Sequence, residues 1–260
     1  MKILVFADLH YFAGTEVKFD PKEKLVAFAE PMLEAFRRVA EEEEVTLAVN
    51  LGDIIQDTND KAQDLACLSL MFDRLAAFPC PVYSVLGNHD LKMMDTVGEV
   101  ECLMGQNPAT FSRDLDGYHL VFLSPELHPE LGLSRGGSYK TQYIGEDTLA
   151  WLREDLRKTA LPTLLFMHFP IAEDDSLGDE CLFLKNRDAV KQILRESGRV
   201  KAVFVAHQHT PRYRVEDGIP HYVIGSPTAA SEVAGVPLGI FHMIEAEGDA
   251  FRVTDRYVRL

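Results

Sequence analysis

Eight aspartate, asparagine and histidine residues stand out because each comes just after a short apolar segment of the chain. They are Asp8, His10, Asp53, Asn88, His89, His168, His207 and His209. Imidazole nitrogens and carboxylate oxygens are ligands that suit manganese, iron and zinc. A carboxylate can also bridge two ions about 3.5–4 Å apart, and Asp53 is suited to that role. These residue types therefore predict a metal site.

Strands are needed to position these side chains. The preceding segments have the length and apolar character of buried strands, at residues 2–7, 45–50, 81–86, 163–167 and 200–205. In open α/β sheets the carboxyl ends of the strands form the ligand-binding crevice. Five strand ends that deliver polar side chains to one edge are hard to explain as packing, so we expect the eight residues to converge.

Segments with helical periodicity alternate with these strands. Apolar residues recur at helical spacing within 25–39, 65–75, 146–158 and 187–197, and Pro31 is expected to kink or split the first helix. Further strands are predicted at 119–124, 219–224, 238–244 and 250–258. The alternation indicates a largely parallel sheet with covering helices. No linker or repeat interrupts the chain, so we predict one domain, residues 1–260.

The order of the polar motifs resembles that of the calcineurin-like metallophosphoesterases. The motifs are D-x-H at 8–10, G-D at 52–53, G-N-H-D at 87–90, His168, and H-x-H at 207–209. The resemblance is greatest to the bacterial group of cyclic-nucleotide and glycerophosphodiester phosphodiesterases. It implies an α/β fold (α+β in some schemes), a four-layer α/β/β/α sandwich with two mixed β-sheets and a dimetal site at the carboxyl ends of strands.

The same resemblance implies a role for each motif residue. One metal ion would be held by Asp8, His10, Asp53 and His209, and the other by Asp53, Asn88, His168 and His207. The ions would be manganese, iron or zinc. Asn88 and His89 would contact the substrate, and His89 would act as the acid near the leaving group. The chain departs from the family at Ala206, where glycine is usual, and we expect at most a small shift of His207.

The implied reaction is hydrolysis of a phosphoester by hydroxide bound to two metal ions. Phosphatases of this superfamily that act on proteins carry an arginine soon after the G-D motif, and residues 52–57 contain none. This favours a small phosphodiester as substrate. A phosphomonoesterase, with Arg113 or Arg135 reaching in from a loop, remains an alternative, as do a nuclease and a non-catalytic scaffold with this fold.

Composition limits the partners of the protein. The net charge of -15 and the absence of a basic run argue against a nucleic-acid partner. No stretch approaches the roughly 18 apolar residues of a membrane helix, and residues 3–6 are too short for the core of a signal peptide. The four cysteines form no C-x-x-C pair, which predicts reduced thiols and a cytoplasmic location.

Several residues near the motifs permit more than one interpretation. Tyr11 and Phe12 could stack on a nucleobase or close over the core. His221 could line the site, but we expect it to face solvent or a backbone group, as we do for His119 and His242. The acidic residues at 173–175 and 179–180 are expected to be solvated or to screen out polyanions.

Overall fold

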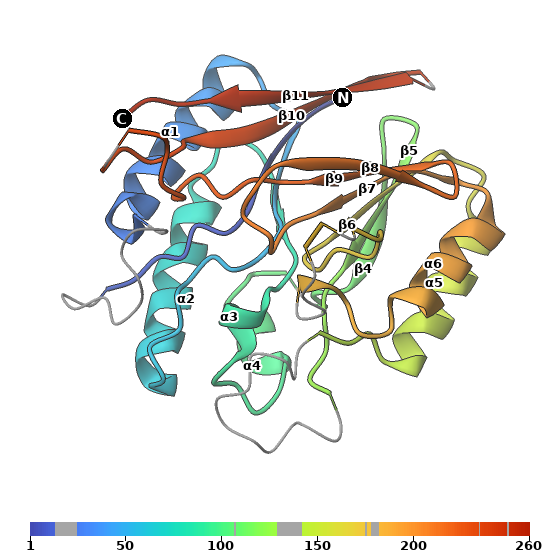
Figure 1. The fold of residues 1–260 in the computed structure, drawn as a ribbon, viewed down its shortest axis with the longest axis horizontal. Coiled ribbons are helices and arrows are strands. Elements are labelled where there is room, and N and C mark those ends of the chain that lie inside the picture. Colours follow the sequence, from blue (N-terminus) through green and yellow to red (C-terminus); the bar gives the residue numbers. More distant parts are fainter. Residues whose placement is uncertain are drawn as a thin grey trace.

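The computed structural model describes residues 1–13, 25–106, 108–128, 142–174, 176–177, 182–233, 235–248 and 250–260 (Figure 1). Within them, two β-sheets pack face to face and helices cover both outer faces. One apolar core lies between the sheets, and a further core lies beneath the helices on each side. The expected four-layer α/β/β/α arrangement is thereby confirmed.

The first sheet is mixed and carries the amino-terminal ligand motifs. Its strand order is β11-β10-β1-β2-β3. The three parallel strands are β1 (Lys2–Phe6), β2 (Leu47–Asn50) and β3 (Val82–Ser84). The carboxyl-terminal strands β10 (Ile240–Glu247) and β11 (Ala250–Tyr257) extend the sheet beside β1 in antiparallel fashion. The end of the chain therefore flanks the strand that bears the first motif.

The second sheet carries the later histidines. Its strand order is β4-β5-β6-β7-β9-β8, with β5, β6, β7 and β9 parallel and the two edge strands antiparallel. The strands are β4 (Phe111–Leu115), β5 (Tyr118–Leu123), β6 (Thr163–Met167), β7 (Val200–Val205), β8 (Arg212–Glu216) and β9 (Ile219–Val223).

A row of aromatic rings crosses the second sheet, with one ring from each strand. The rings are those of Phe111, Phe122, Phe166, Phe204, Tyr222 and Tyr213. Each ring lies opposite the next in the strand register, with centroids 4.6 to 5.3 Å apart. Directly opposed aromatic pairs add stability to a sheet, so this row fixes the strands whose ends carry His168 and the H-x-H motif.

Four longer helices cover the sheets. The helices α1 (Ala29–Glu42) and α2 (Lys61–Ala76) pack on the first sheet, and α5 (Glu146–Lys158) and α6 (Arg187–Ser197) on the second. Each buries one apolar stripe, as the periodicity predicts. The short helices α3 (Asn88–Leu91) and α4 (Gly98–Glu101) follow β3.

Two expectations about local structure require correction. The edge strands β4 and β8 were not predicted, and they bear charged and largely solvent-accessible side chains. Pro31 does not mark a break, because the change from a 3-10 turn (Val26–Phe28) to α-helix falls at Ala29. Pro31 instead occupies the first turn of α1, where a backbone N–H would have no helical partner.

None of the helices in the described parts of the chain is long and apolar enough to cross a membrane. Cys67, Cys80 and Cys102 are free thiols. Cys181 lies outside the described residues.

Candidate metal centre

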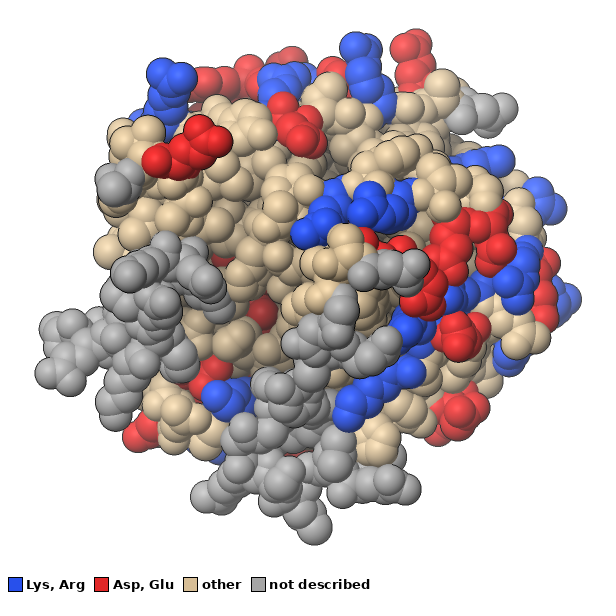
Figure 2. Space-filling model, viewed as in Figure 1, with Lys and Arg blue, Asp and Glu red and all other residues tan. Residues whose placement is uncertain are grey.

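The structure brings the candidate ligands of both sheets to a single crevice. Those of the first sheet follow β1, β2 and β3, and those of the second sheet follow β6 and β7. Backbone bonds join the loops after β1 and β2 to each other at this crevice, since the N–H of Asp8 donates to the carbonyl of Gly52 and that of His10 to the carbonyl of Asp53. A hollow with acidic side-chain surface on its floor is visible near the centre of this face (Figure 2).

The loops that carry the ligands have an unusual backbone. Asp8, His10, Asp53, His207 and His209 all have positive φ, between 50° and 69°. Side chains other than glycine adopt this left-handed region uncommonly, although aspartate and histidine are enriched among those that do. These residues lie in the loops that follow β1, β2 and β7, and all five contribute to the clusters of possible ligands.

Two glycines allow the loops after β2 and β3 to touch. Gly52 has a φ of 91°, and a Cβ on it would lie 2.5 Å from the backbone nitrogen of Gly87. A Cβ on Gly87 would in turn collide with the Asp53 carboxylate. The glycines of the G-D and G-N-H-D motifs are therefore required for the close approach of Asp53 to the loop that carries Asn88 and His89.

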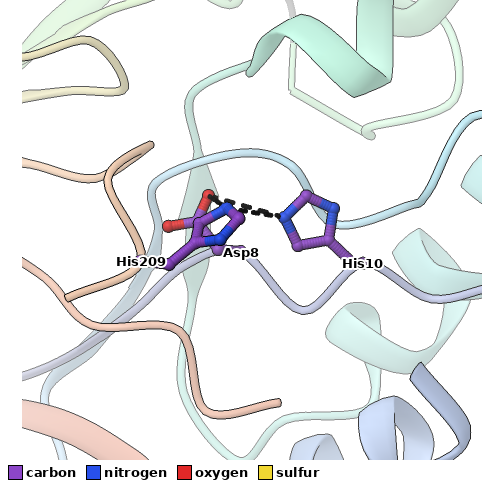
Figure 3. Close-up of side chains that lie close together, drawn as sticks. All are labelled: Asp8, His10 and His209. Carbon is purple, nitrogen blue, oxygen red and sulfur yellow. Dashed lines mark hydrogen bonds and ion pairs between the residues drawn. The ribbon is translucent and has the colours of Figure 1, made fainter. Parts of the chain in front are cut away.

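One cluster of possible ligands consists of Asp8, His10 and His209 (Figure 3). The Nε2 atoms of His10 and His209 lie 3.0 Å apart. Asp8 Oδ1 lies 3.7 Å from His209 Nε2 and 4.0 Å from His10 Nε2. Asp8 and His10 are fully buried. Two imidazole nitrogens and a carboxylate oxygen that face one point can hold a cation.

A second cluster consists of Asp53, His168 and His207. His168 Nε2 lies 3.3 Å from Asp53 Oδ2 and 3.2 Å from His207 Nδ1. The Nδ1–H of His168 donates to the Leu51 carbonyl at 2.7 Å, which leaves Nε2 to face the crevice. Asn88 Oδ1 is buried and accepts no hydrogen bond from the described residues. Asp53 also groups with His10 and His89, so it lies between the two clusters.

The buried carboxylates shape the electrostatics of the site. Burial lowers the pKa of His168, but the nearby Asp53 carboxylate outweighs it and raises that pKa to about 9. Burial raises the pKa of Asp53, and the charges of His168 and His89 hold it well below its usual range. Burial and the charge of Asp53 raise the pKa of Asp90 to about 6. The site thus concentrates negative charge that favours cations.

His89 is oriented by a residue that the sequence analysis did not identify. Asp57 is fully buried, and its Oδ1 lies 2.5 Å from His89 Nδ1. Lys92 donates to the other oxygen of Asp57 at 2.6 Å. With Nδ1 held by Asp57, Nε2 of His89 faces the clusters and lies 3.9 Å from Asp53 Oδ2. A charged residue two positions after the apolar pair Ile54–Ile55 was the available signal for Asp57.

Further polar residues hold the ligand loops from behind. Asp90, the last residue of the G-N-H-D motif, accepts hydrogen bonds from the backbone N–H groups of Asp53, Ile54 and Gly87. The hydroxyls of Ser226 and Thr228 donate to the carbonyl of Asp8 at 2.8 and 3.3 Å.

His119, His242 and Tyr11 lie away from the two clusters and have contacts of their own. His119 contacts Asp114 and Asp155 through its two ring nitrogens, and His242 contacts Asp255. Tyr11 packs against the core beneath α1 and α2, which favours the interpretation that it closes over the core.

The two described acidic residues of the segment after His168 are ion-paired rather than freely solvated. Glu173 contacts Arg187 and Lys191, and Asp174 contacts Arg212 and Arg214. This pairing offsets the negative charge of these two residues and weakens the repulsion that they could exert on anions. Arg113 donates to the hydroxyl of Tyr83 at the edge of the second sheet. Three acidic residues of the segment and the other arginine considered lie outside the described residues: Asp175, Asp179, Glu180 and Arg135.

The two sheets and the paired clusters define the class of metal-dependent phosphoesterases. The family model for calcineurin-like phosphoesterases matches residues 1–211, and the chain belongs to this family of hydrolases. It is 25% identical over 232 residues to a probable cyclic nucleotide phosphodiesterase from Rhodopseudomonas palustris, covering 86% of this chain and 77% of the relative.

Solved structures share the fold. A dimetal phosphatase from Danio rerio superposes with a TM-score of 0.77 at 17% identity, over 98% of this chain and 96% of the other. A purple acid phosphatase from Lupinus luteus seeds superposes with a TM-score of 0.63 at 12% identity, over 98% of this chain and 51% of the other. The family implies two metal ions, and the donor set fits them: imidazoles, carboxylates and the buried Asn88 oxygen face common points.

Proposed function

We propose that this protein hydrolyses a small phosphodiester with the help of two metal ions. The observation that carries the proposal is the pair of clusters that meet at Asp53. One ion would be held by Asp8, His10, Asp53 and His209, and the other by Asp53, Asn88, His168 and His207. When bound, two such ions lower the pKa of water and neutralise the phosphate oxygens.

His89 is the proposed acid for the leaving group. Its Nδ1–H donates to Asp57, which fixes the ring with Nε2 toward the crevice. A proton on Nε2 can then pass to the oxygen that departs from phosphorus. Lys92 keeps Asp57 ionised because it holds the second carboxylate oxygen. Asn88 and His89 thus lie side by side in the chain, with one directed to a metal ion and the other to the substrate.

Lys92 and Arg113 are held in other contacts, which favours a diester over a monoester as substrate. A monoester dianion needs more positive charge than a diester, and the loop from Asp53 to Asp57 supplies no arginine. Lys92 is committed to Asp57, and Arg113 lies on the edge strand β4 against Tyr83. The relative from Rhodopseudomonas palustris supports the same class of substrate. The net charge of -15 supports a small molecule over a nucleic acid.

Hydrolysis of two chromogenic esters tests the proposal. Purified protein supplied with Mn²⁺ is expected to cleave bis-p-nitrophenyl phosphate faster than p-nitrophenyl phosphate, and excess chelator is expected to abolish both activities. A strong preference for the monoester would replace the diester assignment with a phosphomonoesterase. Rapid cleavage of duplex DNA would indicate a nuclease. Metal analysis of protein purified without added metal would distinguish manganese, iron and zinc.

The proposal also covers the cellular location and the domain organisation of the protein. We place it in the cytoplasm because Cys67, Cys80 and Cys102 are free thiols, as a reducing compartment would keep them. We also treat residues 1–260 as one domain, since strands from the end of the chain complete the sheet that begins with β1.

A further inference from the structure

A phenylalanine ring packs against two histidines of the second cluster. Phe169 follows His168 directly in the chain, and its ring centroid lies 4.9 Å from that of His168 and 4.6 Å from that of His207. The two histidine rings lie 5.1 Å apart, so each of the three rings lies within aromatic packing distance of the other two. Phe169 is only 1% exposed. It is therefore a buried neighbour of two proposed ligands.

The surroundings of Phe169 hold its ring in place. The side chain belongs to the apolar core beneath α5 and α6, and side chains in such cores are closely packed. The backbone is held on both sides of the residue. The carbonyl of His168 accepts from the N–H of Ala206 at 2.8 Å, and the carbonyl of Pro170 accepts from the N–H of Leu184 at 3.0 Å. The ring can therefore act as a fixed surface for a neighbouring side chain.

His207 needs such a surface because of the atom that it presents to the cluster. Its Nδ1 lies 3.2 Å from His168 Nε2, so Nδ1 is the nitrogen that faces the second metal position. The torsion χ2 of histidine is broad, and a turn about it moves Nδ1 away from the cluster. The ring of Phe169 is tilted by 60° to that of His207, and at this short distance it opposes such a turn.

The first cluster also has a third ring, but of a different kind. The ring of His10 lies 4.8 Å from that of His209 and 4.8 Å from that of His89. The third ring there is thus the polar His89, the proposed acid. Phe169 takes the corresponding place at the second cluster. A phenyl ring offers no lone pair to a metal ion and no proton to a leaving group, so packing is the contribution that it can make.

We infer that Phe169 is a positioning residue of the second cluster, whose ring holds His207 with Nδ1 toward the metal position. The inference rests on the proposed function, since it concerns the second of the two proposed ions. It connects the core beneath α5 and α6 to a ligand at the end of β7. An aliphatic side chain can fill that core, but it lacks the flat face that the ring of His207 rests on.

Substitution by leucine separates positioning from general stability. In titration calorimetry the parent is expected to bind two Mn²⁺ ions, and Phe169→Leu is expected to bind one of them about 10–100-fold more weakly, the usual effect of losing an outer contact of a metal ligand. Phe36→Leu is the matched control. Phe36 is fully buried on α1 against the rings of Phe6 and Phe241, and its variant is expected to keep both affinities. Parent-like affinities in Phe169→Leu, or an equal loss in both variants, would refute the inference.

Crystal structures of the metal-free proteins test the positioning without metal. The ring of His207 is expected to have one orientation in the parent, with Nδ1 toward His168, and to be turned about χ2 or to have two orientations in Phe169→Leu. One unchanged orientation in both proteins would overturn the inference. This comparison still decides it if the parent binds no Mn²⁺ and the proposed function fails. If Phe169→Leu does not fold, Phe169→Met, which fills irregular space without a flat ring, takes its place.

Discussion

Replacing His89 by alanine is expected to separate proton transfer from metal binding. The backbone N–H of His89, which donates to Asp53 Oδ1 at 2.8 Å, survives the change. Asp57 keeps its bond from Lys92, so no buried carboxylate is left unpaired. The fold and both metal ions should therefore be retained. Turnover should fall by about 10²–10⁴, the usual contribution of a positioned general acid, which is about 3–5 kcal/mol of activation free energy.

The dependence on the leaving group makes this prediction specific. With Mn²⁺ in excess, initial rates are compared for one diester that releases p-nitrophenolate and one that releases an alkoxide. An alkoxide needs a proton as it leaves, so His89→Ala should lose more activity on the alkyl ester than on the nitrophenyl ester. Full activity on the alkyl ester would refute the acid role. Loss of bound metal in His89→Ala would show instead that His89 is a ligand.

Three further perturbations follow from the same contacts. Asp53→Ala should lose metal and activity together, measured by elemental analysis and diester hydrolysis, because it removes the residue shared by both clusters. Asp57→Asn should keep its metals and lower turnover about 10–100-fold, since an amide does not fix the His89 ring as a carboxylate does; unchanged turnover would contradict this. Burial lowers the pKa of His119, but hydrogen bonds to its two aspartate partners outweigh this and raise it. Its stabilising contribution is thus complete below the unfolded-state pKa of about 6.5 and lost as pH rises through the higher folded value. Urea denaturation of the parent protein should show a fall in the free energy of unfolding above neutral pH, and His119→Gln should lack this fall. Identical pH profiles of the two proteins would refute this prediction.

The positions of the candidate ligands were predictable because two independent signals coincide. Apolar segments identify the strands, and polar residues of metal-binding type come just after them. Since the carboxyl ends of parallel strands meet at one edge, the strand pattern is enough to predict that Asp8 and Asp53 lie close together. The backbone bond from Asp8 to Gly52 joins their loops as expected. His168 comes from the second sheet, whereas the strand pattern alone indicated a single sheet, and it meets Asp53 across the two sheets. Their individual roles as ligands stay predictions until metal is measured.

The edge strands β4 and β8 could not be predicted in the same way. An edge strand with exposed faces needs no apolar alternation, so residues such as Arg113, Asp114 and Arg214 conceal it. Ion pairs between residues that are distant in the sequence were equally hard to predict. Lys92 is 35 residues from Asp57, and Arg214 is 40 residues from Asp174, with which it forms an ion pair. Charge counts along the chain therefore mistook paired residues for solvated ones.

The left-handed backbone of the ligand loops connects these observations to function. Each non-glycine residue in that region costs on the order of 1–3 kcal/mol, so the loops persist only where surrounding contacts compensate. Asp90 supplies such contacts to Asp53, and Ser226 and Thr228 supply them to Asp8. These residues touch neither the crevice nor a substrate in our proposal. They nevertheless determine where the ligand atoms lie, so substitutions among them should weaken metal binding without removing a ligand.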